Sequence, residues 1–241
     1  MSKKSRDYIE RFIGDEPPVI EIEDVCKSYQ PGVDALKDVN ISIERGEFVF
    51  IVGHSGSGKS TLIKLLMKEV NPSSGKIYVN NKDLSRIRHN QIPMLRRKIG
   101  VVFQDFRLLK DRNIYENVAF AQRVIEKSSK DISRNVPSVL SIVGLKDQMD
   151  KFPKELSGGE QQRVSIGRAL IYSPAIVLAD EPTGNLDSEA SQEIIRLLED
   201  SNQKYNQTIV IITHDERIAM RAKRVLTMKD GQVVRDERVR R

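Results

Sequence analysis

Residues 46–70, GEFVFIVGHSGSGKSTLIKLLMKEV, decide the fold of this 241-residue chain. The run FVFIV (48–52) consists of apolar, strand-favouring residues and predicts a β-strand. A loop rich in glycine and serine follows, and from Lys59 onward apolar residues recur at helical spacing. The order strand, loop and helix predicts an α/β fold, and the loop is the first candidate for a binding site.

The loop satisfies the pattern G-x-x-x-x-G-K-[ST], a phosphate-binding P-loop, with Gly53, Gly58, Lys59 and Ser60 at the fixed positions. Glycines let the backbone wrap closely around phosphate oxygens, so that N–H groups and the N-terminus of the next helix point at the negative charge. Lys59 offers a cation to the β- and γ-phosphates, and the Ser60 hydroxyl is placed to ligate Mg²⁺. The predicted nucleotide-binding residues are Gly53, His54, Ser55, Gly56, Ser57, Gly58, Lys59, Ser60 and Thr61.

Two adjacent carboxylates end a second apolar run, AIVLADEP, at residues 175–182. A continuous apolar run is typical of a strand buried on both faces, as in a parallel sheet. Asp180 can hold the Mg²⁺ shell, and Glu181 can polarise an attacking water as a general base. The alternative is that Glu181 only begins a loop, because Pro182 favours a turn. The P-loop and the acid pair together predict hydrolysis of a nucleoside triphosphate.

The remaining pattern predicts one α/β domain over residues 19–241. Strands are expected at residues 19–25, 38–44, 46–52, 97–105, 175–181 and 207–215, with a further strand inside 73–84. Residues 112–172 have a helical pattern with turn signals at 143–147 and 151–159, and residues 187–205 predict a helix capped by Asp or Ser. A helical subdomain is therefore expected at about residues 105–172.

Composition narrows the class of protein. An apolar fraction of 39% supports a sizeable core, and the lone Cys26 excludes an internal disulfide and a cysteine-built zinc site. The apolar runs are shorter than the roughly 20 residues that span a bilayer, so we expect a cytoplasmic protein. Nine Lys or Arg face three Asp between residues 82 and 112, a surplus equal to the net charge of +6. This segment is either a solvated face or a contact for an acidic partner, and without an aromatic signature we expect no nucleic acid.

Both ends of the chain are expected to be flexible. Residues 1–18 form a polar leader, although Tyr8, Ile9, Phe12 and Ile13 could form one apolar stripe of a short helix. The C-terminal RDERVRR, residues 235–241, reads as a solvated tail.

The segment LSGGEQQR, residues 156–163, resembles the signature motif of ATP-binding cassette (ABC) ATPases. It lies just upstream of the acid-ended strand, as in that family, and the resemblance covers about residues 19–234. The resemblance implies an ABC nucleotide-binding domain with a RecA-like P-loop core, an antiparallel β-subdomain and a helical subdomain. It also implies roles for Tyr29 (stacking on adenine), Gln104 (touching Mg²⁺ or the attacking water), Asp187 (in the D-loop) and His214 (contacting the γ-phosphate).

The family works as head-to-tail dimers. By that resemblance, two cassettes trap ATP between the P-loop of one copy and Ser157, Gly158 and Gly159 of the other, and hydrolysis releases the homodimer. A helix N-terminus preceded by Ser-Gly-Gly suits this role, because its exposed amides favour phosphate.

Within the family, the stretch FQDFRLL and the arginines before it most resemble cassettes of bacterial cell division. Those cassettes dock a separate integral membrane protein at the inner face of the cell membrane and control cell-wall hydrolases across it. The alternative is the ATPase subunit of a transporter for lipoprotein release or for macrolide or peptide export, because such relatives share ADEPTGNLD. A DNA-repair ATPase would need a longer insertion before the signature, and a scaffold without catalysis would be expected to lack Glu181 or His214.

Overall fold

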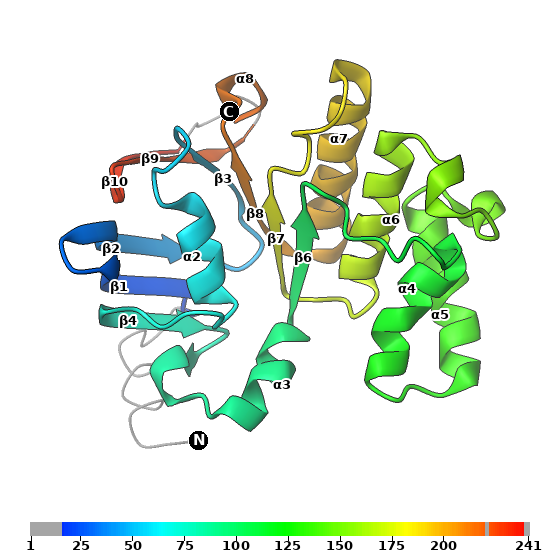
Figure 1. Cartoon of the computed structure of the whole chain (residues 1–241), viewed down its shortest axis with the longest axis horizontal. Coiled ribbons are helices and arrows are strands. Elements are labelled where there is room, and N and C mark those ends of the chain that lie inside the picture. The colour runs from blue at the N-terminus through cyan, green and yellow to red at the C-terminus, as the bar shows by residue number, and fades with distance from the viewer. Residues whose placement is uncertain (1–15, 220–221, 239–241) are drawn as a thin grey trace.

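The structure is a computed structural model that describes residues 16–219 and 222–238 (Figure 1). The apolar stripe predicted at residues 8–13 lies outside the described residues, as does the leader before residue 16. The strands are β1 (Ile20–Gln30), β2 (Val33–Ile43), β3 (Phe48–Val52), β4 (Ser74–Val79), β5 (Lys82–Asp83), β6 (Ile99–Phe103), β7 (Ile176–Asp180), β8 (Thr208–Thr213), β9 (Arg224–Lys229) and β10 (Gln232–Arg238). The helices are α2 (Lys59–Leu66), α3 (Ile92–Arg96), α4 (Ile114–Val124), α5 (Ser129–Ile142), α6 (Gly158–Leu170), α7 (Ser188–Tyr205) and α8 (Glu216–Ala219).

A six-stranded sheet forms the centre of the molecule, in the order β10-β9-β3-β8-β7-β6. All neighbouring strands pair in parallel except β10, which is antiparallel to β9. In β3, Val49 and Ile51 belong to one apolar cluster and Phe50 and Val52 to another, so the strand is buried on both faces. This double burial explains why the predicted core strands are continuous apolar runs.

Parallel pairing brings the predicted catalytic segments to one edge of this sheet. Phe103 lies opposite Asp180 in the β6–β7 pair, and Val52 lies opposite Thr213 in the β3–β8 pair. The residues just beyond these strand ends therefore share the carboxyl edge, where ligands of open α/β sheets bind. They are Gly53, Gln104, Glu181 and His214.

An antiparallel sheet in the order β2-β1-β4-β5 forms the subdomain predicted near the N-terminus. Apolar residues of β1, β2, α2 and one face of the central sheet form a single cluster. Both long strands extend further than predicted: β1 runs to Gln30 and β2 begins at Val33, joined by a turn at residues 31–32. The polar residues around this turn concealed the strand ends in the sequence.

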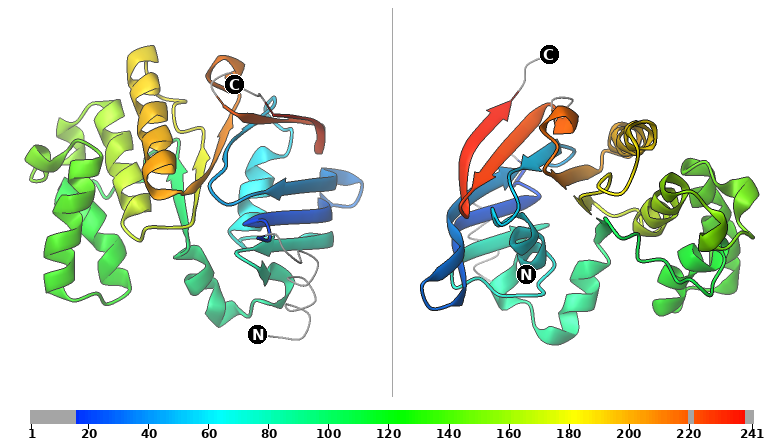
Figure 2. Two further views of the ribbon diagram at one scale, coloured as in Figure 1. Left: turned by 180° about the vertical axis from the view of Figure 1, so that it is seen from behind. Right: turned by 45° about the horizontal axis from the view of Figure 1, so that its top comes forward.

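Helices α4, α5 and α6 pack together on the other side of the molecule (Figure 2). Each begins at a polar cap, Asn113, Ser128 or Ser157, whose side chain accepts a hydrogen bond from the backbone of the first turn. The break between α4 and α5 contains no glycine. Glu126 takes the left-handed conformation (φ 57°) in its place, just after the end of α4. In the described part of the chain, no helix is long and apolar enough to cross a bilayer.

Residues 235–238 of the predicted C-terminal tail are exposed, but they form part of strand β10 and are not a free tail. Arg224, a buried residue of β9, donates hydrogen bonds to both carboxylate oxygens of Asp236 at 2.9 and 2.8 Å and to Glu47 at 2.7 Å. The strand was not predicted, because the cation that orders this segment lies 12 residues before Asp236.

Candidate nucleotide-binding site

The loop between β3 and α2 is closed around the ammonium group of Lys59. Lys59 Nζ donates hydrogen bonds to the carbonyl oxygens of Gly53 (2.6 Å) and His54 (2.9 Å) and to Ser57 Oγ (3.3 Å). Its side chain is nearly buried, and desolvation lowers the pKa of the amine, while two nearby carboxylates act in the opposite direction. The ammonium group is thus positioned at the centre of the loop by main-chain oxygens.

Two glycines of the loop are required by packing as well as by phosphate approach. A Cβ atom on Gly53 would lie 2.3 Å from the carbonyl oxygen of Met228 in β9. Gly58 has φ +103°, and a Cβ atom there would lie 2.7 Å from the carbonyl oxygen of Ala35 in β2. The loop is therefore wedged between both sheets.

A cavity of about 790 Å³ opens beside this loop and brings together most of the predicted site. Its lining includes the P-loop, the acid pair, Gln104 and His214. Two lining residues, Ala35 and Ile212, were not predicted, since neither carries a polar side chain that would mark a site. The lining residues are Ala35, His54, Ser55, Gly56, Gly58, Lys59, Ser60, Thr61, Gln104, Asp180, Glu181, Ile212 and His214.

The two carboxylates differ in their surroundings. Burial raises the pKa of Asp180, the charge of Glu181 raises it further, and Lys59 partly offsets both. Glu181 has φ +49°, a conformation that non-glycine residues rarely adopt and that is typical of functional sites. Its N–H donates to the carbonyl oxygen of Ile212 (2.9 Å), which ties the exit of β7 to the end of β8.

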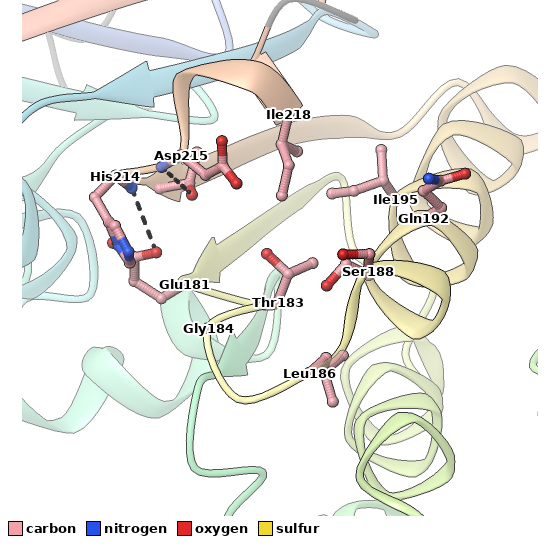
Figure 3. Close-up of a pocket in the computed structure, with 12 residues that line it drawn as sticks. Glu181, Thr183, Gly184, Leu186, Ser188, Gln192, Ile195, His214, Asp215 and Ile218 are labelled. Atoms are coloured by element: carbon pink, nitrogen blue, oxygen red, sulfur yellow. Dashed lines mark hydrogen bonds and ion pairs between the residues drawn. The ribbon is translucent and has the colours of Figure 1, made fainter.

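His214 contacts the second carboxylate directly (Figure 3). Its Nδ1 lies 2.9 Å from Glu181 Oε1, and its backbone N–H donates to Glu181 Oε2 at 3.4 Å. A second cavity, of about 570 Å³, extends from this pair towards α7 and is lined by Thr183, Ser191 and Ile195 among others (Figure 3). Glu181 and His214 therefore line both cavities and lie at the boundary between them.

Gln104 is held by the segment that follows the acid pair. Its Nε2 donates to Asn185 Oδ1 at 3.1 Å, and Asn185 Nδ2 donates back to the Gln104 carbonyl oxygen at 3.0 Å. A Cβ atom on Gly184 would lie 2.7 Å from Gln104 Nε2, so a larger residue there would displace the Gln104 side chain from this amide pair. Asn185 was missed in the sequence, although it stands in the GNLD segment that contains the predicted Asp187.

Besides Tyr29 and the P-loop residues Gly53 and Ser57, four predicted residues do not line this cavity: Ser157, Gly158, Gly159 and Asp187. Ser157 caps α6 in a capping box, in which Ser157 Oγ accepts from the Glu160 N–H (3.2 Å) and Glu160 accepts from the Ser157 N–H (2.8 Å). Asp187 caps α7 by accepting from the Ala190 N–H at 2.8 Å. Within one chain, Ser157 and Asp187 are therefore helix caps, and Gly158 and Gly159 belong to the first turn of α6.

Tyr29 also lies apart from the P-loop cavity, near the end of β1. It is 51% exposed, and Lys27 Nζ lies 5.1 Å from the centroid of its ring. An exposed aromatic face on the β-subdomain is chemically suited to stacking on a base.

The basic segment 82–112 is partly used inside the fold. Arg96 Nε donates to the Met67 carbonyl oxygen at 3.0 Å. The guanidinium of Arg107 lies 3.5 Å from the ring centroid of Phe103. Arg97 is exposed, as Arg96 and Arg107 are.

This arrangement can bind and hydrolyse a nucleoside triphosphate. Amides, an ammonium group and a hydroxyl face one cavity together with two carboxylates and an imidazole. Groups of these types neutralise phosphate charge, hold a divalent cation and polarise water.

Comparisons with known proteins agree with this geometry. The family model described as ABC transporter matches residues 36–184. The cell division ATP-binding protein FtsE of Bacillus subtilis is 49% identical over 220 residues, which are 91% of this chain and 96% of that protein. The protein of the same name from Escherichia coli K12 is 46% identical over 216 residues, 89% and 97% of the two chains. A dimeric ATP-binding cassette in a post-hydrolysis state with ADP and Pi has a TM-score of 0.82 and 36% identity, covering 92% of this chain and 99% of that one.

Proposed function

Because the chain belongs to the ABC transporter family and is one of its ATP-hydrolysing subunits, we propose that it drives a membrane complex of bacterial cell division. The observation that carries this proposal is the 46–49% identity to FtsE proteins over about nine-tenths of the chain. In the proposed cycle, ATP hydrolysis controls cell-wall hydrolases across the membrane. The second candidate is a transporter subunit for lipoprotein release or for macrolide or peptide export.

The P-loop cavity supports specific roles in hydrolysis. Lys59 would bind the β- and γ-phosphates, and Tyr29 would stack on the adenine. Glu181 would act as general base, because its carboxylate lies at the cavity and is oriented by the His214 imidazole at 2.9 Å. His214 would in turn contact the γ-phosphate. Gln104 reaches the same cavity and would orient the attacking water.

The oxygen ligands at the cavity fit a magnesium ion. The Ser60 hydroxyl, the Asp180 carboxylate and the Gln104 amide oxygen line it together, and oxygen ligands are those that Mg²⁺ prefers. The raised pKa of Asp180 supports this assignment, because a divalent cation would offset the burial and the repulsion by Glu181 that cause it. Bound Mg²⁺ would neutralise charge that develops on the phosphates.

The helix caps outside the cavity fit a site completed by a second copy of the chain. Ser157, Gly158 and Gly159 present the N-terminus of α6, a suitable partner for the phosphates held by the opposite P-loop. Asp187 caps α7, whose first turn lies beside that of α6. The cassette of similar structure is itself dimeric.

The proposed membrane partner is an FtsX-like integral protein, and the chain would sit peripherally on the inner face of the cell membrane. Arg97, Arg107 and Arg112 lie near Gln104 in sequence and could meet acidic groups of that partner or of lipids, at about 1 kcal/mol per residue for lipids. Arg96 is the weaker candidate, because its Nε is engaged by the Met67 carbonyl oxygen. We expect Arg97→Glu to reduce membrane recruitment while nucleotide binding is retained.

The test is affinity capture of the tagged Glu181→Gln variant from native membranes with ATP and Mg²⁺, followed by mass spectrometry. Blocking hydrolysis should hold the closed dimer on its partner, and the same variant without nucleotide is the matched control. Recovery of an FtsX-like protein with division proteins supports the proposal. Recovery of a substrate-translocating permease instead supports the transporter alternative.

A further inference from the structure

Helix α6, which begins at the signature motif, sends a glutamine side chain to the two catalytic strand ends of its own chain. Gln162 is fully buried in the second turn of α6. Its Nε2 donates to the Phe103 carbonyl oxygen at 3.2 Å and to the Pro182 carbonyl oxygen at 2.7 Å. One amide group therefore holds two main-chain oxygens that belong to different loops.

Both oxygens belong to residues that neighbour a proposed catalytic residue in the chain. Phe103 is the last residue of β6 and precedes Gln104, while Pro182 follows Glu181 just beyond the end of β7. The two strands are neighbours in the central sheet. A change in the position of the Gln162 amide would therefore move the peptide plane that precedes Gln104 and the plane that lies one residue beyond Glu181.

The same helix also holds the far side of the loop that contains Gln104. Arg168 NH2 donates to the Phe106 carbonyl oxygen at 2.8 Å, and Arg168 NH1 donates to that of Arg107. Phe106 and Arg107 have φ values of 57° and 50°, so two consecutive residues take a conformation that needs outside support. Helix α6 thus binds this loop on both sides of Gln104, through Gln162 at Phe103 and through Arg168 at Phe106 and Arg107.

The oxygen of the Gln162 side-chain amide indicates which of its interactions matter. Gln162 Oε1 is buried and has no hydrogen-bond partner among the described residues. An unpaired buried acceptor is unfavourable, so this glutamine is a poor choice for stability alone. The two hydrogen bonds that Nε2 donates are therefore the reason for a glutamine at this position.

We propose that Gln162 is a positioning residue for hydrolysis, which couples the signature helix to Gln104 and Glu181 of the same chain. Contacts that the second copy makes with the N-terminus of α6 would reach both residues through this amide. The inference rests on the proposed roles of Gln104 and Glu181, and its test is separable from theirs.

The test compares Gln162→Met with Gln207→Met in the full chain. Methionine keeps the volume but removes the donor, and loss of the unpaired Oε1 limits the damage to folding. Gln207 is the matched control, because it is also buried and its Nε2 donates to the Pro174 carbonyl oxygen at 2.9 Å, remote from the catalytic loops. We expect Gln162→Met to lower kcat for ATP about 10- to 100-fold, with Kd for ATP unchanged within about twofold. Gln207→Met should lower Tm without this loss of kcat.

Two further variants make the result decisive. Gln162→His can donate one ring N–H in place of two bonds, so its kcat should lie between those of the wild type and Gln162→Met, and this comparison also serves if Gln162→Met does not fold. Glu181→Gln tests the proposed base separately. If Glu181→Gln stops hydrolysis while Gln162→Met matches Gln207→Met in kcat, the coupling inference is wrong. If Glu181→Gln hydrolyses ATP normally, the proposed role of Glu181 is what fails.

Discussion

Replacing Arg224 with methionine should destabilise the fold from a point outside the catalytic cavity. The Arg224 side chain is 6% exposed and makes three sets of hydrogen bonds: to Asp236, to Glu47 and to the Ser42 carbonyl oxygen at 2.7 Å. Arg224→Met keeps most of the apolar contact of the stem but removes every donor. Two carboxylates and a carbonyl oxygen then lose their buried cation.

The size of the effect depends on how exposed those partners are. Removing one partner of a buried ion pair costs about 3–5 kcal/mol, whereas exposed pairs contribute about 0–1 kcal/mol. Asp236 is 43% exposed and Glu47 21%, and Glu47 keeps Arg238 at 3.5 Å. We therefore expect a loss of about 2–3 kcal/mol in the free energy of unfolding, or about 4–12 °C in Tm for a domain of this size.

Urea unfolding at pH 7 measures this loss, with Arg235→Met as control. Arg235 lies in the same hairpin, is 65% exposed and pairs with Glu237 at 3.5 Å, so its replacement should change the stability by less than about 0.5 kcal/mol. Equal losses in the two variants would refute the assignment of a stabilising network to Arg224.

The pH dependence gives an independent check. Hydrogen bonds from Arg224 lower the pKa of Asp236, so the folded state binds this proton less readily than the unfolded state. The stabilisation of the fold by ionised Asp236 is complete above the ordinary Asp pKa of about 3.9. It is lost as the pH falls through the lowered pKa of Asp236. The difference between wild type and Arg224→Met should therefore shrink in acid. A constant difference down to the acid transition would contradict this account.

Three further predictions concern the site. Lys59→Met should weaken ATP binding by about 1.5–3 kcal/mol, roughly 10- to 100-fold in Kd by calorimetry, because a charged hydrogen-bond donor to phosphate is lost. Asp180→Asn should raise Tm without nucleotide at pH 7 and abolish the further rise with Mg²⁺ and ATP; since its pKa is raised, Asp180 costs stability once the pH exceeds that value, and a fall in Tm would contradict this. Ser157→Ala should cost about 1 kcal/mol of stability through the lost helix cap, and in the Glu181→Gln background it should weaken ATP-driven dimerisation measured by light scattering; an unchanged dimer would refute its part in the shared site.

The sequence was sufficient for the core strands and for the residues that line the cavity other than Ala35 and Ile212, because both depend on local pattern. The P-loop glycines, the acid pair and His214 each follow a strand that is legible as an apolar run, and parallel pairing brings them to one edge. The extension of β2 to Val33 and the formation of β10 were not predicted, because they depend on pairing with distant strands. Asn185 and Gln162 were missed for the same reason: their hydrogen-bond partners lie 81 and 59 residues away.

The predicted residues at the N-termini of α6 and α7 lie apart from the cavity and need a separate explanation. Ser157 and Asp187 are explained within one chain as helix caps, and caps of this kind are common enough to need no ligand. A capping box does not require two glycines after the serine, however, and glycine is a poor helix former. Within the chain, a Cβ atom added to Gly158 would lie 3.2 Å from the Leu186 side chain, which could shift, and one added to Gly159 would lie 3.1 Å from the Ala190 Cβ, which is fixed to the backbone of α7. In the proposed dimer, the two glycines would also let the phosphates held by the P-loop of a second copy approach the N-terminus of α6.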